Sequence, residues 1–196
     1  MQKCPDITDT LVRSLTELRA LERYTLEALE LQQHEDDLEE HHSAAELISD
    51  VTDVLRDHVE RLDAQIAVIG GSPQALRAAA SSMAGAFLGF LSKIRSHETA
   101  KMLRDDYTLL SLASVGYLML HTTAVALRQA EVADLAIRHH RELSPLVNEI
   151  AEMLPHLVLH DLSQSFGGLN RGAAETTLLV ANNSVVTDTA TWAATA

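Results

Sequence analysis

The sequence contains little of what disulfide-stapled proteins and small β-proteins require. Of its 196 residues only one is cysteine and only 4% are aromatic, with 8 glycines and 4 prolines. A single cysteine excludes an intramolecular disulfide framework and a cysteine-rich zinc site. The shortage of aromatic and turn-forming residues argues against a β-sandwich or barrel. The chain is long enough for one domain with an added tail.

Positive charge is also scarce. The chain has 28 acidic residues against 15 Lys and Arg, and its net charge is −13 at pH 7. A protein with this balance is not expected to bind nucleic acid through a basic face. The N-terminus lacks the cationic start and apolar run of a secretory signal. The uncharged stretch 108–127 is long enough to span a bilayer, but its Ser, Thr and His residues favour a buried core helix over a membrane span.

The first third of the chain is typical of helices, because it contains neither glycine nor proline between residues 6 and 69 and is rich in Leu, Glu, Ala and Arg. Apolar residues three or four apart predict one helix with a stripe over 7–29. A second stripe covers 47–66 and includes His58. Ser43 and Glu46 fit a capping box at the start of the second helix, and Gly70-Gly71 should end it.

The rest of the chain predicts further helices. Ser72-Pro73 resembles the start of a third helix that reaches about residue 95. Asp105 or Asp106 is expected to cap a fourth helix that ends near residue 128. A fifth is expected over 131–153, interrupted at Pro145, and Pro155 should begin a last short helix to about 165. The tail 169–196 is either flexible or packed on a partner subunit, with strand-like composition over 178–186.

Several segments together resemble the bacterial ferritin-like stress proteins of the YciE/YciF type. The pattern of their second helix, His-x-Glu-Glu-Thr-x-x-Gln-Ile-x-x-Leu, falls in step with four residues here. The exit from that helix, the entry to the next main helix and the last helix also correspond, over about residues 15–155. The corresponding positions are His58, Glu60, Gln65, Ile66, Gly71-Ser72-Pro73, Leu103-Arg104-Asp105-Asp106 and Ala133–Ile150.

This resemblance implies an all-α fold. Residues 1–165 would form a ferritin-like four-helix bundle with a crossover helix, and residues 166–196 a short C-terminal extension. It further implies a cytoplasmic bacterial protein linked to stress, acting as a homodimer or larger homo-oligomer. No enzymatic activity is established for the family as a whole.

The family's dinuclear metal site can be carried over position by position. Its second-helix ligands fall on Glu60 and Asp63, and its last-helix glutamate falls on Glu142. On the first helix Glu22 is the best match. Glu27 and Glu30 are rivals at this position.

The remaining ligand positions hold residues that cannot bind a metal. The third-helix positions are Gly116 and Met119, and the partner of Glu142 falls on Val147. We therefore expect a degenerate site with one metal ion or none. No cofactor is expected, and iron or manganese is the alternative.

The other histidines have two interpretations each. His139 and His140 are more simply surface residues, although His140 could lie near the site. His156 and His160 are four apart, which suits a metal ion, but surface positions are commoner. His121 is expected to be a core histidine bonded across the helices, with ligation as its alternative.

The sequence offers no nucleophile elbow and no phosphate-binding loop. We expect a non-enzymatic ferritin-like protein that acts through binding or assembly and has lost its metal centre wholly or largely. One alternative is a metal-binding oxidoreductase or iron-handling protein. Another is a shell or particle protein, and a different protein partner remains open.

Overall fold

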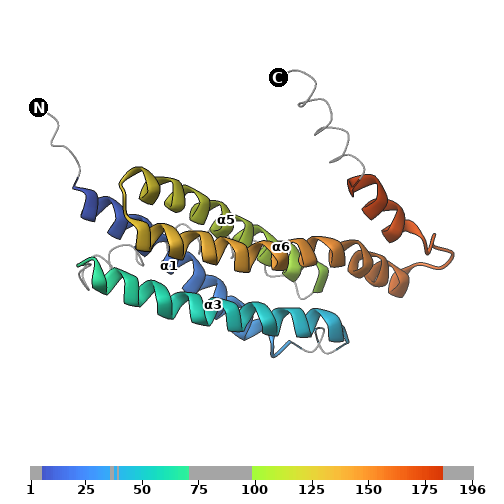
Figure 1. The fold of residues 1–196 in the computed structure, drawn as a ribbon. Helices are drawn as coiled ribbons and strands as arrows, with labels where there is room; N and C mark the ends of the chain where they lie inside the picture. Colours follow the sequence, from blue (N-terminus) through green and yellow to red (C-terminus); the bar gives the residue numbers. More distant parts are fainter. Residues whose placement is uncertain (1–5, 36–37, 39, 71–98, 183–196) are drawn as a thin grey trace, which may run out of the picture.

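The chain folds into long helices. The computed structural model describes residues 6–35, 38, 40–70 and 99–182, and this part contains helices and no strand, which confirms the all-α prediction. Four long helices lie side by side in Figure 1. They are α1 (Ile7–Gln32), α3 (His42–Val68), α5 (Thr99–Ala126) and α6 (Ala130–Ser165).

The helices form because each carries apolar residues at helical spacing. The predicted stripes on α1 and α3 are confirmed: from Leu11 to Leu29 and from Leu47 to Ile66 they are buried, whereas Ile7 is exposed. Helix α1 packs against α3 and α5, and α6 packs against α5 and α3. One core therefore runs along all four helices.

The start of α3 differs from the expected capping box. The helix begins at His42, its N-cap is His41, and no side chain caps it, so Ser43 already lies inside the first turn. The predicted end is confirmed at Gly70, which follows the helix in the left-handed conformation with φ +86°. Glycine adopts this conformation without a steric penalty.

The expected cap at Asp105 or Asp106 is wrong. Both residues lie inside α5, whose described part starts at Thr99, and both side chains are buried. They are tolerated there because each has a polar partner: Arg104 bonds to Asp105, and Gln32 on α1 bonds to Asp106 at 3.1 Å. These acids therefore belong to the packed interior and not to a helix end.

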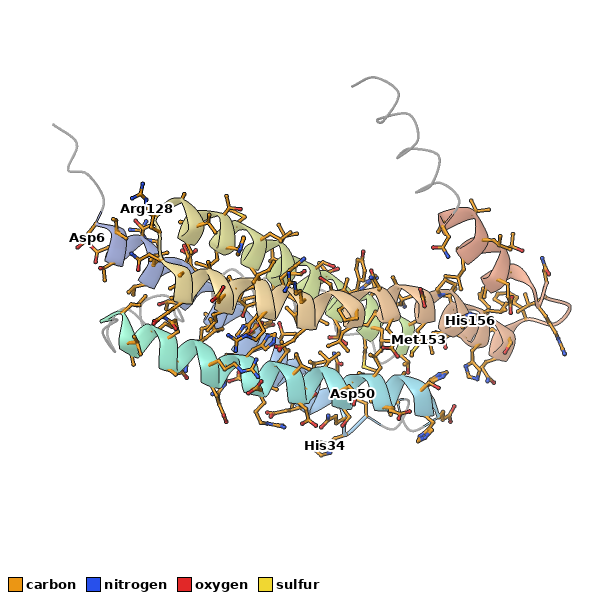
Figure 2. The ribbon with its side chains drawn as sticks, in the orientation of Figure 1. Asp6, His34, Asp50, Arg128, Met153 and His156 are labelled. Atoms are coloured by element: carbon orange, nitrogen blue, oxygen red, sulfur yellow. The ribbon has the colours of Figure 1, made fainter. Side chains whose placement is uncertain are left out.

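The expected break in the last part of the chain is also wrong. Helix α6 continues through both Pro145 and Pro155 to Ser165. Pro145 is exposed, so water can hydrate the carbonyl that its missing N–H leaves unpaired. The turn before α6 is tight, with Arg128 at φ +58°, and Figure 2 marks this residue at the turn.

Residues 173–182 form a short helix after α6, so the strand-like interpretation of 178–186 is wrong for residues 178–182. The helix expected to follow Ser72-Pro73 lies outside the described residues, as does the rest of the tail.

Helix α5 leaves part of its apolar surface uncovered. It is long and apolar enough to cross a membrane, yet 39% of its most apolar window is buried among the other helices. Five of its uncovered apolar residues share one face of the helix, which we call the α5 stripe: Leu112, Val115, Leu118, Met119 and Val125.

Candidate functional site

A buried histidine joins three helices at the centre of the core. The ring of His58 on α3 is fully buried, with Nδ1 at 3.0 Å from Oε1 of Glu22 on α1. Its other nitrogen, Nε2, lies 2.7 Å from Oε2 of Glu142 on α6. Both ring nitrogens are thus occupied by carboxylates from different helices.

Two further side chains complete the centre. The ring of His139 on α6 stacks on that of His58, with centroids 3.7 Å apart and planes within 6° of parallel. His139 Nδ1 lies 2.9 Å from the hydroxyl of Tyr117 on α5, and the Tyr117 ring meets both imidazoles edge-on. All four helices therefore contribute to one buried polar cluster, which we call the interior cluster: Glu22, His58, Tyr117, His139 and Glu142.

Burial dominates the electrostatics of the cluster. It raises the pKa of Glu22, although hydrogen bonding to His58 opposes this shift. Burial also raises the pKa of Tyr117, assisted by the nearby charge of Glu22. For His139, burial and then the positive charge of its neighbours lower the pKa to about 2, so this imidazole is neutral at pH 7.

Glu142 differs because it lies at the edge of the cluster. Burial opposes its ionisation, but hydrogen bonding to His58 and the charge of Arg61 outweigh burial and lower its pKa. The Arg61 guanidinium donates to both carboxylate oxygens of Glu142, with the Oε2 distance at 3.1 Å. Glu142 is therefore an ionised carboxylate that already has two hydrogen-bond partners, His58 and Arg61.

A proton must lie on each side of the His58 ring. Since Glu142 is ionised, Nε2 carries a proton and donates it to Oε2. At 3.0 Å two facing lone pairs would repel, so Nδ1 and Glu22 Oε1 share a second proton. His58 thus has no free lone pair to offer a metal ion in this arrangement.

Two buried polar atoms of the cluster have no hydrogen-bond partner among the described residues: Glu22 Oε2 and His139 Nε2. The Tyr117 hydroxyl favours the ionised form of Glu22, but it does not form a hydrogen bond with Glu22 Oε2. Potential ligand atoms of Glu22, His58 and His139 lie within 4.8 Å of one another. By distance alone these three side chains could surround a single ion.

Of the four ligand candidates, the structure brings Glu22 and Glu142 together through His58. The expectation that Glu60 and Asp63 face the interior is wrong for Glu60, which is exposed. Asp63 is half-buried in a two-pronged ion pair with Arg19 of α1. The physical reason is helical geometry, because residues two and five positions from an inward His58 lie on other faces of the helix.

Of the third-helix positions, Met119 was also assigned to the wrong face. Met119 is 67% exposed, so it does not line the interior. Gly116 is half-buried and lies against α1, where an added Cβ would come within 2.7 Å of Leu18 Cδ2. The inward residue of this turn is Tyr117, a hydrogen-bonding side chain that binds metals poorly while its burial keeps it protonated.

The remaining histidines divide between core and surface. His139 is buried, which corrects its expected surface position, while His140 is half-buried and bonds Ser114 Oγ at 2.9 Å. His121 is half-buried. His156 and His160 are both exposed, which agrees with the surface interpretation, and His160 contacts the ring of His41.

Sequence reasoning missed His139 and Tyr117 as members of the site. The signal was present in the apolar spacing around each one. His139 continues the series Val132, Ala136 and Leu143, and Tyr117 continues Leu110, Ala113 and Leu120, all of which are buried.

Comparisons of the chain with protein-family models, with curated proteins and with solved structures find no match.

Proposed function

We propose that this chain is a ferritin-like helical protein whose interior metal centre has been replaced by its own side chains. It acts through binding or assembly and not as an enzyme. In ferritin-like proteins, carboxylates on facing helices surround two cations. Here two carboxylates from α1 and α6 face each other across His58.

The observation that carries the proposal is the occupation of both His58 nitrogens by carboxylates. The imidazole and its protons take the place where a cation would bridge Glu22 and Glu142. Arg61 adds positive charge at Glu142, which opposes the binding of a further cation. A two-ion site does not fit these residues, because Glu60 is exposed and Asp63 is paired with Arg19.

The direction of the helices supports the ferritin-like bundle with a crossover. Residues His41, Thr99 and His160 line one pocket, so α3 and α5 begin at the same end of the molecule. Helix α3 therefore ends at the opposite end from the start of α5, and Figure 1 shows both helices running the same way. Parallel neighbours in sequence are what a crossover connection requires.

Metal analysis tests the loss of the interior centre. Protein made in medium with added iron and manganese should contain well under one ion of either metal per chain. Glu22→Gln should not change that content, because no metal depends on Glu22. Glu60→Ala serves as an exposed control, and thermal unfolding of both variants should be insensitive to added iron.

A second candidate function is an iron-handling or redox protein with one interior ion. The unpaired atoms Glu22 Oε2 and His139 Nε2 favour it, since buried polar atoms without partners are costly. Stoichiometric iron or manganese that is lost in both Glu22→Gln and His139→Ala would support this candidate and contradict the proposal.

The α5 stripe supports action through assembly. It is uncovered apolar surface, and it lies on a helix with no charged residue between Asp106 and Arg128. In a chain with net charge −13, this uncharged face is where two copies can approach with the least repulsion. We therefore propose a second copy of the chain as the occupant of the α5 stripe.

Substitution in the stripe tests this assembly. Val115→Glu combined with Met119→Glu should convert a wild-type dimer into a monomer, because two charges would be buried in the interface. Light scattering measures the mass. Leu31→Glu is the control, since this residue is 66% exposed but lies on α1 and is not part of the stripe.

A monomeric wild-type chain, or a dimer that survives both glutamates, would contradict a second copy on α5. Recovery of the wild-type chain in the membrane fraction would also contradict it and favour a membrane around α5. Assemblies far larger than a dimer would support the shell or particle alternative.

A further inference from the structure

A second group of metal-binding side chains lies far from the interior cluster, at the end where α3 and α5 begin. A pocket of about 450 Å³ is lined there by residues before α3, at the start of α5 and along the last turns of α6. Two histidines and two acids face it: Glu40, His41, His160 and Asp161. Figure 2 marks His156 on the same part of α6, one turn before His160.

The pocket brings ligand atoms from separate parts of the chain close together. Ligand atoms of His41, His160 and Asp161 all lie within 4.8 Å of one another. The two imidazole rings have centroids 4.5 Å apart and planes at 81°. His160 Nδ1 is 3.8 Å from Asp161 Oδ1.

The ring geometry suits a shared ion. Two imidazoles on one zinc ion, each with a Zn–N bond of about 2 Å, hold their ring centres roughly 5 Å apart. Rings that are nearly perpendicular can aim nitrogens at one point. The stacked, parallel rings of His58 and His139 cannot do so without turning. The two clusters therefore differ in their capacity for metal.

The ring nitrogens of His160 are also accessible for binding a metal ion. They lie 3.8 Å from Asp161 Oδ1 and 3.5 Å from Gln164 Nε2, which are longer than good hydrogen bonds. The side chain of His160 is 42% exposed and that of Asp161 is 32% exposed, so an ion in solution can reach both. Glu40 and Asp161 add negative charge that favours a cation.

We infer that His41, His160 and Asp161 form a binding site for one divalent transition-metal ion of the zinc type. Two imidazole nitrogens and one carboxylate oxygen match the preference of zinc for nitrogen and oxygen ligands. With three protein ligands, a fourth position stays open to water or to Glu40, which lines the same pocket. The ion would tie the segment before α3 to the last turns of α6.

Titration with Zn²⁺, and with Co²⁺ as a spectroscopic probe, tests the site in the full chain at pH 7.5. We expect one ion per chain and a Co²⁺ spectrum typical of four ligands. His41→Ala and His160→Ala should each weaken binding by roughly 100-fold or more, and Asp161→Asn by roughly tenfold. His156→Ala is the matched control, since it removes an exposed histidine from the same helix and should leave binding unchanged.

Three results would overturn the inference. One is the absence of stoichiometric binding to the wild-type chain. Another is equal binding in the wild type and in the His41→Ala/His160→Ala double variant. The third is binding that disappears with His139→Ala, which would place the ion in the interior cluster. Helical circular dichroism confirms that each variant is folded, and the partial exposure of His160 and Asp161 makes their replacement compatible with folding.

Discussion

Replacing His58 with alanine should lower the free energy of unfolding by about 3–5 kcal/mol, the cost of removing one partner of a buried ion pair. The substitution leaves Glu22 fully buried without its hydrogen-bond partner and opens a cavity against His139. It also removes one partner of Glu142. Urea unfolding followed by circular dichroism measures the change.

A double-mutant cycle with Glu22→Gln identifies the origin of this loss. In the Glu22→Gln background there is no buried carboxylate to leave unpaired, so His58→Ala should cost clearly less than in the wild type. Equal costs in both backgrounds would mean that His58 contributes only packing. His58→Gln, which keeps an amide in the same place, extends the cycle if the alanine variant is too unstable to measure.

The second large effect concerns Asp106, which is buried beneath α1 and bonded to Gln32. Burial raises its pKa to about 7, Gln32 opposes the shift, and the neighbouring Asp105 adds to it. The unfolded chain has a carboxyl pKa near 4. Between these values the folded protein binds the extra proton, so this group's contribution to stability is complete below about pH 4 and is lost as the pH rises through about 7.

Asp106→Asn should remove this dependence, because the amide cannot ionise and still offers an oxygen to Gln32. Relative to the wild type, the variant should gain roughly 2–4 kcal/mol of stability between pH 4 and pH 8, since each pKa unit is worth about 1.4 kcal/mol. Urea unfolding across this range measures the difference. Asp50→Asn is the control, because Asp50 is exposed on α3, where Figure 2 marks it.

A constant difference between Asp106→Asn and the wild type from pH 4 to pH 8 would contradict the account of Asp106. Such a constant difference is expected for an Asp106 carboxylate that is paired with a cation and stays ionised from pH 4 to pH 8. Arg104 bonds the neighbouring Asp105 instead.

For the described residues, the sequence was sufficient to predict the long helices, because a stripe of apolar residues depends only on local spacing. The stripes of α1 and α3 were identified in this way, and the α3 stripe already placed His58 inward. The ends of the helices were harder to predict. The start of α3 and the passage of α6 through Pro145 depend on hydration and packing that spacing does not encode.

The site was predicted in part for a similar reason. The structure places Glu22 and Glu142 in one cluster around His58, but Glu60 was taken from a family pattern whose register is not that of the inward face. Contacts between separate helices, such as Arg19 with Asp63 or His41 with His160, require the packing of the whole molecule. The spacing of residues along one helix cannot predict these contacts.

Anomalous diffraction from crystals of the full chain grown with excess manganese tests the central claim most directly. We expect no anomalous peak among Glu22, His58, His139 and Glu142, with the His58 ring lying between the two carboxylates. A peak about 2 Å from their oxygens and nitrogens, with His58 turned to coordinate it, would contradict the account.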